Sequence, residues 1–192
     1  MRFERREHVV GIRKARGYPW HGPPHIGKDN AYRIVSAACY EHKHILNTPE
    51  RLAWLEKELL DTIKDNNVHC PAWCVLPNHY HVLVFLKDAA HFSQHLGRFH
   101  GRTSRLMNRE DDTAGRKVWH RCEDRFMRSE RHFYTSVNYI HYNPVRHGWA
   151  SEWAEWSYSS IHGYLDEKGE DWLLNVWQDY PVKDYGEKWD KL

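Results

Sequence analysis

Hydrophobic and polar residues alternate in several short segments of the chain, and each such segment predicts a β-strand. Four strands are expected, at residues 31–40, 69–76, 79–86 and 117–127, where β-branched and aromatic residues gather. Pro77 and Asn78 separate the second and third strands, and this pair is typical of a tight turn. The second and third strands should therefore form a hairpin.

Three longer segments carry apolar residues at helical spacing. The first helix is expected at about residues 49–66, because Thr48 and Pro49 favour a helix start there. Its apolar side would consist of Leu52, Leu55, Leu59 and Ile63. A second helix is expected at about residues 91–108. Ser129 can cap a third, which should end near Tyr142 because Asn143 and Pro144 follow.

The predicted order, β-α-β-β-α-β followed by a helix, is that of a ferredoxin-like α+β sandwich with an antiparallel sheet. Residues 1–30 are basic and interrupted by Gly and Pro, so we expect an N-terminal arm. Residues 31–164 would form the folded domain, and residues 165–192 an acidic C-terminal tail. The chain is rich in Trp from Val145 onward, and this part should wrap around the domain.

Composition narrows the class of protein. The 192 residues suffice for one domain with its own core, and 41% hydrophobic with 28% charged residues is typical of a globular protein. The apolar stretches are too short to cross a bilayer, and the basic N-terminus lacks the apolar region of a secretory signal. We therefore expect a cytoplasmic protein without membrane contact, whose four cysteines are reduced thiols.

The net charge of +2 conceals an asymmetry. Residues 145–192 carry 5 Lys or Arg and 10 Asp or Glu, whereas the preceding residues carry 23 basic and 16 acidic side chains. A basic body fits a polyanion such as nucleic acid, and the acidic end could compete for the same surface. A solvated surface of uneven charge is the alternative.

His79 and His81 are the first candidates for chemistry. Residues two apart on a strand point to one face of the sheet, so the two imidazoles could share a divalent ion. Tyr80 would point to the other face. With 16 histidines in the chain, a chance pair of exposed side chains is the competing interpretation.

The third helix supplies the next candidates. Tyr139 lies off the apolar side of this helix, and Asn143, four residues later, shares its side. The Asn143 amide oxygen could complete a metal site begun by the histidines, with His132 as a substitute ligand. A half-buried packing tyrosine and an ordinary residue at a helix end are the alternatives.

The second helix carries a ridge of arginines with no acidic residues among them, and such a ridge would suit contact with a phosphate backbone. The ridge consists of Arg98, Arg102, Arg105 and Arg109. A solvated helix face is the competing interpretation. A zinc site at Cys70, Cys74 and His69 is conceivable, but buried thiols are the default for such cysteines.

Three segments together resemble a known family. The sequence PNHYH at residues 77–81 resembles the His-hydrophobic-His (HUH) motif of single-tyrosine transposases, with Tyr80 as a bulky departure. YIHYNPVRHG at residues 139–148 and WSYSS at residues 156–160 resemble two segments of the REP-associated tyrosine transposases. The resemblance covers about residues 31–164.

The resemblance implies a mechanism. His79, His81 and Asn143 would bind Mg²⁺ or Mn²⁺, and Tyr139 would be the nucleophile that forms a 5′-phosphotyrosine with single-stranded or hairpin-forming DNA. The strand could then be rejoined without ATP. The relatives include dimers that exchange the tyrosine helix and monomers, so a monomer and a homodimer both remain open. No protein partner is predicted.

Two other functions remain open. One is a DNA- or RNA-hairpin-binding protein that kept the fold without catalysis, although the complete set of four site residues argues against it. The other is a small metal hydrolase with a longer row of alternating histidines. That class would need another histidine near position 83, which is Leu83 here.

Overall fold

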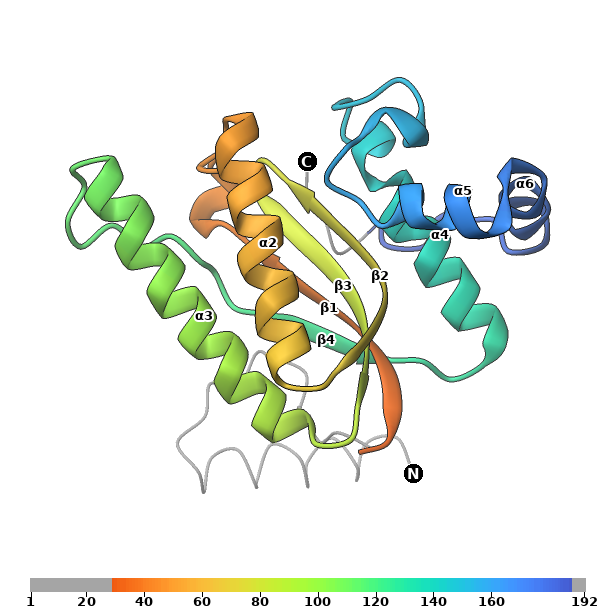
Figure 1. Cartoon of the computed structure of the whole chain (residues 1–192), viewed down its shortest axis with the longest axis horizontal. Helices are drawn as coiled ribbons and strands as arrows, with labels where there is room; N and C mark the ends of the chain where they lie inside the picture. Colours follow the sequence, from red (N-terminus) through yellow and green to blue (C-terminus); the bar gives the residue numbers. More distant parts are fainter. Residues whose placement is uncertain (1–28, 188–192) are drawn as a thin grey trace.

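The computed structural model describes residues 29–187. The expected basic arm at residues 1–30 therefore lies outside the described residues, except for its last two. Four strands form one antiparallel sheet in the order β2-β3-β1-β4, with β1 at Ala31–Ala38, β2 at His69–Leu76, β3 at His79–Leu86 and β4 at Glu123–Phe126 (Figure 1). This is the sheet of the ferredoxin-like α+β sandwich, so the predicted fold class is confirmed.

Two helices cover one face of the sheet, α2 at Pro49–Asp65 and α3 at Ala89–Glu110 (Figure 1). Each begins at a side-chain cap, since Thr48 accepts a hydrogen bond from the Arg51 amide and Asp88 accepts one from the His91 amide. Their apolar sides bury the even-numbered residues of β3, among them Tyr80 and Val82, in the first hydrophobic core.

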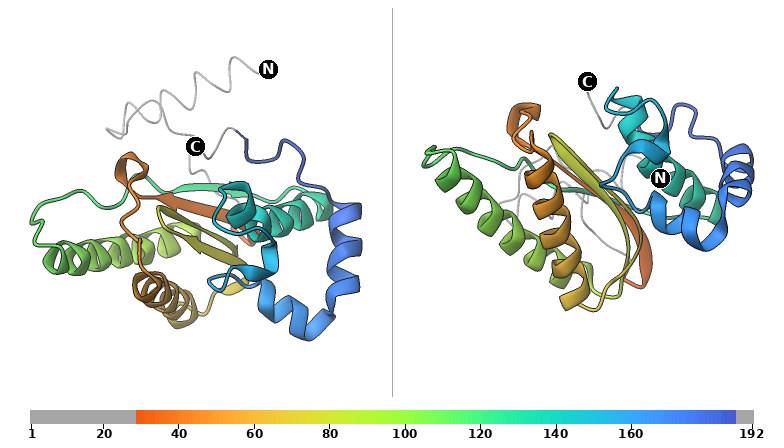
Figure 2. Two further views of the ribbon diagram at one scale, coloured as in Figure 1. Left: turned by 90° about the horizontal axis from the view of Figure 1, so that it is seen from above. Right: turned by 45° about the horizontal axis from the view of Figure 1, so that its top comes forward.

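A third helix, α4 at Glu130–Arg146, covers the opposite face (Figure 2). Its Val137 and Ile140 pack on Ile34 of β1 and Leu83 of β3 in the second core. Both sheet faces are thus buried. Strand alternation divides β3 between the two cores and places its odd-numbered residues beneath α4.

The remaining elements are short and lie around this sandwich: η1 at Tyr40–His42, η2 at Trp153–Glu155, α5 at Ile161–Lys168 and α6 at Glu170–Asp179. Between η2 and α5, the chain runs along the outer edge of β2. There Trp156 donates its indole N–H to the Val75 carbonyl at 2.8 Å, and the Val75 amide donates to Tyr158 at 2.9 Å. The WSYSS segment therefore covers what would be an exposed strand edge.

Three predicted boundaries are wrong. The first strand, expected at residues 31–40, ends at Ala38, because Tyr40–His42 form η1. The fourth strand is confined to Glu123–Phe126, because the bridge between Cys39 and Trp119 is displaced by one residue from the register of β1 with β4, which interrupts the ladder. The helix expected to end near Tyr142 continues through Pro144 to Arg146. Pro144 lies inside α4, two residues before its end, and cannot donate an amide hydrogen bond there.

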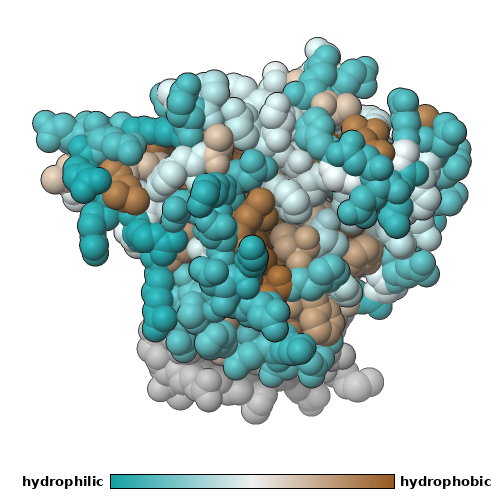
Figure 3. Space-filling view, in the orientation of Figure 1, coloured by the Kyte–Doolittle hydropathy of each residue, from teal (hydrophilic) through white to brown (hydrophobic). Residues whose placement is uncertain are grey.

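The expected acidic tail, residues 165–192, includes the end of α5 and all of α6. Leu173, Val176 and Val182 are buried, and Asn138 of α4 donates from its amide to the carbonyls of Val176 and Tyr180. Figure 3 shows a mainly hydrophilic face with hydrophobic surface gathered near its middle. Within residues 29–187, no helix combines the length and apolar character needed to span a bilayer.

Candidate active site

His79 and His81 lie side by side on the sheet face that α4 covers. Their ring centroids are 4.9 Å apart, and both side chains are buried. Tyr80 points to the opposite core beneath α2 and α3. The structure therefore brings the two imidazoles together on one face, as the alternation of the strand predicts.

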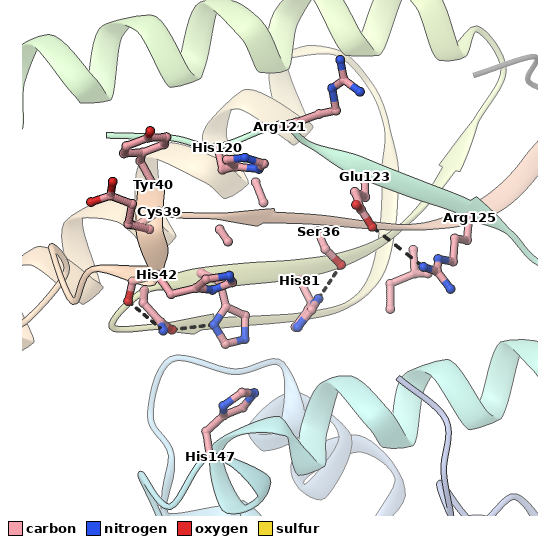
Figure 4. A pocket seen from close by; sticks show the side chains of 16 residues that line it. Ser36, Cys39, Tyr40, His42, His81, His120, Arg121, Glu123, Arg125 and His147 are labelled. Atoms are coloured by element: carbon pink, nitrogen blue, oxygen red, sulfur yellow. Dashed lines mark hydrogen bonds and ion pairs between the residues drawn. The ribbon is translucent and has the colours of Figure 1, made fainter. Parts of the chain in front are cut away.

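Each imidazole is held at its Nδ1 atom. Ser36 of β1 stands opposite His81 in the sheet, with its Oγ 2.6 Å from His81 Nδ1 (Figure 4). Asn78, in the turn before β3, places its Oδ1 2.6 Å from His79 Nδ1. These contacts fix the ring planes at the start of β3.

Asn143 reaches this pair from α4. Its side chain is fully buried, and its Oδ1 lies 2.8 Å from Nε2 of His79. The continuation of α4 through Pro144 keeps Asn143 in helical geometry and directs its side chain toward the sheet. Residues 79 and 143, remote in sequence, are thus in direct contact.

Tyr139 lies one turn earlier on the same side of α4. Its ring centroid is 5.2 Å from that of His81 in an edge-to-face arrangement. Only 1% of its surface is exposed, whereas the sequence analysis placed Tyr139 beside the buried side of the helix. The phenol and the two imidazoles therefore meet within one chain, but the phenol is enclosed.

The enclosure comes from residues 182–186, which we call the C-terminal strap. Tyr185 packs its ring 5.5 Å from that of Tyr139, and Arg146 donates a 3.0 Å hydrogen bond to the Tyr185 carbonyl. Gly186 has a φ of 80° and lies so close that an added Cβ would stand 2.2 Å from Cε2 of Tyr139. The Tyr185 hydroxyl is further held by Ser136 at 2.5 Å. His132, considered as a substitute ligand, also contacts this hydroxyl, at 2.9 Å.

A pocket of about 510 Å³ opens beside the histidines and extends along the sheet toward β4. Figure 4 shows Arg121, Glu123 and Arg125 on its β4 side and His147 on its α4 side. Sequence analysis singled out none of these residues. Ser36 pairs with His81 on one side and with Glu123 on the other, and this register places β4 beside the histidines. The sequence alone does not fix the register, so it could not identify these pocket residues.

The arginine ridge of α3 lies elsewhere. All four of its side chains are exposed, but α3 covers the face opposite to His79 and His81, so the sheet separates the ridge from the site. Arg102 also forms an ion pair with Glu58 of α2 at 2.9 Å. We expected no acidic side chain to pair with the arginines of this ridge, and at Arg102 that expectation is wrong. The acid, Glu58, comes from α2, so the sequence around Arg102 does not reveal it.

The donor set fits a divalent ion. Two imidazole nitrogens and one amide oxygen suit Mn²⁺ or Mg²⁺ in a mixed nitrogen and oxygen site. Neighbouring ligands of an octahedral ion with bonds of about 2.1 Å stand roughly 3 Å apart, close to the 2.8 Å between His79 Nε2 and Asn143 Oδ1. No group of three or more His, Cys, Asp or Glu in the described part of the chain could hold a metal ion, so a site here requires the amide.

His147 borders the site and is neutral at neutral pH. Its ring centroid is 4.9 Å from that of His79. Burial, and then the nearby His81, Arg146 and His42, lower the pKa of His147 to about 4. An uncharged His147 adds no positive charge beside the imidazoles that would bind a cation.

The cysteines take no part in this site. All four are free thiols. Burial raises the pKa of Cys39, Cys70 and Cys122 to about 12, and burial also raises the pKa of Cys74 well above its ordinary value. Thiols in this state are inert packing groups. Within residues 29–187, Cys70, Cys74 and His69 do not form a group that could hold a metal ion, so the structure gives no support to a zinc site there.

Comparison with known proteins adds to this geometry. The model of the IS200-like transposase family matches residues 28–143. The chain is 26% identical over 110 residues to the REP-associated tyrosine transposase of Escherichia coli K12, covering 56% of this chain and 63% of that protein. A candidate REP-associated tyrosine transposase of Haemophilus influenzae is 29% identical over 105 residues, covering 47% and 57%. The chain thus matches less than two thirds of the length of either relative.

The fold has a counterpart among solved structures. A REP-associated tyrosine transposase bound to a REP hairpin superposes with a TM-score of 0.61 at 18% identity, covering 77% of this chain and 87% of that one. At this identity the likeness concerns the fold alone.

Proposed function

The chain belongs to the IS200-like transposase family, and on that premise we propose that it cleaves and rejoins single-stranded DNA through a covalent bond to Tyr139. One observation carries the proposal: Tyr139, His81, His79 and Asn143 form a continuous cluster built from α4 and β3. A phenol next to a metal-binding donor set is the minimum equipment for this type of phosphoryl transfer.

In the proposed reaction, the phenolic oxygen of Tyr139 attacks the scissile phosphorus of the DNA strand. The new bond joins this oxygen to phosphorus, and the bond from phosphorus to the 3′ oxygen breaks. The phenolic proton passes to solvent, and the departing 3′ oxygen takes up a proton. The products are a 5′-phosphotyrosine and a free 3′-hydroxyl. A 3′-hydroxyl can reverse the step and join strands without ATP, because the phosphodiester is conserved in the covalent link.

His79, His81 and Asn143 are the residues that would hold Mg²⁺ or Mn²⁺. When bound, the ion acts as a Lewis acid that withdraws charge from the scissile phosphate. Such help is needed because a tyrosine with a pKa near 10 is a weak nucleophile at neutral pH. The chain itself holds the imidazole rings in place, through Ser36 and Asn78.

The pocket beside the histidines is our candidate for the path of the DNA strand. Arg121 and Arg125 line it, so phosphates could be neutralised within reach of the site. Its volume of about 510 Å³ suits an unpaired nucleotide rather than a duplex. We propose a hairpin as the recognised form, supported by the solved relative bound to a REP hairpin. The arginines of α3 would then contact the stem from the other side of the sheet.

The test is formation of a covalent adduct. The full-length protein, incubated with Mn²⁺ and a 3′-labelled hairpin oligonucleotide with single-stranded flanks, should yield a labelled protein–DNA band on a denaturing gel, because the covalent link retains the fragment on the 3′ side of the cleaved bond. EDTA and the variant Tyr139→Phe should abolish the band. Tyr142→Phe, on the same helix, is the matched control and should leave it intact. An undiminished adduct in Tyr139→Phe would exclude Tyr139 as the nucleophile.

A second candidate function is hairpin binding without catalysis. The 1% exposure of Tyr139 favours it, because the phenol in this arrangement is covered by the strap. Under this alternative, the protein would bind the hairpin, give no adduct under any metal condition and lose no affinity in His79→Ala. The same gel and a parallel binding titration therefore separate the two functions.

A further inference from the structure

Asn78 belongs to the PNHYH segment, and the contact of its side chain with the His79 ring has a chemical consequence beyond holding the ring in place. It stands in the turn between β2 and β3, half-buried, directly before His79. Its backbone carbonyl accepts a hydrogen bond from the Cys39 amide at 2.7 Å, which ties the turn to the end of β1. The backbone is thus fixed whatever the side chain does, and the carboxamide is available for a separate role.

The carboxamide has one orientation that satisfies its surroundings. Its Nδ2 donates to the backbone carbonyl of His42 at 3.3 Å, and a carbonyl can only accept. The nitrogen of the amide must therefore face His42, and the oxygen must face His79. The hydrogen-bond network, rather than the shape of the side chain, settles which way the amide points.

This orientation determines where neutral His79 carries its proton. Asn78 Oδ1 lies 2.6 Å from His79 Nδ1, and an amide oxygen accepts but cannot donate. This contact requires a hydrogen on Nδ1, and it is the shorter of the two that the ring makes with amide oxygens. Neutral imidazole has one N–H, so Nε2 is left with its lone pair. Histidine side chains without such a partner favour the opposite tautomer, with the proton on Nε2.

The lone pair of Nε2 points at a second acceptor. Asn143 Oδ1 is 2.8 Å away, so with the proton on Nδ1 the contact is satisfied by a cation between the two atoms or, without metal, by the Asn143 amide turning its Nδ2 toward Nε2. Ser36 contacts His81 at the same ring position, Nδ1, but a hydroxyl can donate or accept and so leaves the His81 tautomer open. Of these two contacts, that of Asn78 is the one that dictates a tautomer.

We propose that Asn78 is a positioning residue that holds the proton of His79 on Nδ1 and thereby keeps Nε2 available to a divalent cation beside Asn143. The inference rests on the proposed function for its metal, but the tautomer can be measured without any metal. Partners of metal-binding histidines that act in this way typically change metal affinity by about 10- to 100-fold when removed.

The first measurement is the tautomer itself, in the metal-free, full-length protein at pH 8. Long-range ¹H–¹⁵N correlation spectra distinguish a protonated Nδ1 from a protonated Nε2, and His79→Gln identifies the His79 signals. Wild-type His79 should carry its proton on Nδ1, and Asn78→Ala should move it to Nε2. Asn78→Asp, which keeps an oxygen acceptor, should retain the wild-type tautomer. Asn66→Ala, which removes another amide bonded to a backbone carbonyl, is the matched control and should change nothing.

The second measurement is the Kd for Mn²⁺, by electron paramagnetic resonance. Asn78→Ala should weaken binding by about tenfold or more, while Asn78→Asp should bind as well as wild type. A wild-type proton on Nε2, an unchanged tautomer in Asn78→Ala, or a shifted tautomer with an unchanged Kd would each overturn the inference. If wild type binds no Mn²⁺, the proposed function fails, and the tautomer measurement alone decides the role of Asn78.

Discussion

Gly186 lies against the ring of Tyr139, so close that no other residue type fits at this position without displacement. The contact joins the proposed nucleophile to a segment 47 residues further along the chain. Its positive φ of 80° also favours glycine. The Tyr139 ring has little room to yield, since His81 stands on another side of it at 5.2 Å. A larger residue at position 186 should therefore move the strap rather than the ring.

We expect Gly186→Ala to lower stability by about 1–3 kcal/mol, as overpacking in a core does, and to speed adduct formation by exposing Tyr139. Truncation after Pro181 should speed it further, because it removes the strap entirely. Initial rates of adduct formation, with the reactivity of Tyr139 toward a nitrating reagent, check both variants. Slower adduct formation in the truncated protein would show instead that the strap supports the active arrangement.

All four proposed site residues come from one chain, which leads to a prediction about complementation. Tyr139→Phe and His79→Ala, each inactive alone, should remain inactive when mixed, because neither chain then contains a complete site. An enzyme that exchanges its tyrosine helix between subunits would regain activity in the mixture. Co-expression of the two variants, followed by the adduct gel, repeats the test under conditions that allow mixed dimers to assemble. Restored activity would show that Tyr139 acts on the partner copy.

Local sequence rules predicted the parts of the site but not their assembly. Strand alternation places His79 and His81 on one face, and helical spacing places Tyr139 and Asn143 on one side. That α4 packs on that same face depends on the path of the chain after β4, which no local pattern encodes. Pro144 misled the helix boundary, because the bias of a residue before proline away from helical geometry is only a tendency, and the burial of Asn143 against the sheet overrides it here. The contact of Gly186 with Tyr139 left no signal at all, since it joins two segments remote in sequence.

The two basic surfaces should contribute differently to DNA binding. Arg125→Gln, in the pocket, should slow adduct formation and reduce the salt dependence of hairpin affinity by less than one full phosphate contact, since Arg125 already lies 3.8 Å from the Glu123 carboxylate. Arg105→Gln, on α3, should weaken binding as well but leave the rate at saturating DNA unchanged, because the sheet separates it from Tyr139. Arg102→Gln is the matched comparison and should cost less affinity, since Arg102 is already paired with Glu58. Affinities at several salt concentrations and single-turnover rates provide the check, and a slower saturating rate in Arg105→Gln would contradict the separation.

Stability should fall in mild acid because of a histidine far from the site. His100 stacks on Trp119 with ring centroids 4.8 Å apart, and its Nε2 lies 2.8 Å from the Tyr80 hydroxyl. Burial lowers the pKa of His100 from 6.5 to about 4. The unfolded chain therefore binds a proton at this residue at a higher pH than the folded chain does. The stabilising contribution is complete above pH 6.5 and is lost as the pH falls from there toward 4.

Between pH 7 and pH 5, the loss from His100 should be about 2 kcal/mol. Urea unfolding at both pH values measures it, with His100→Gln as the control that lacks the titrating group. The free energy of unfolding of His100→Gln should fall by less than that of wild type over this interval, by about the same 2 kcal/mol. Parallel pH profiles for the two proteins would mean that His100 accepts a proton in the folded state without opposition from its surroundings, and that other groups set the acid sensitivity.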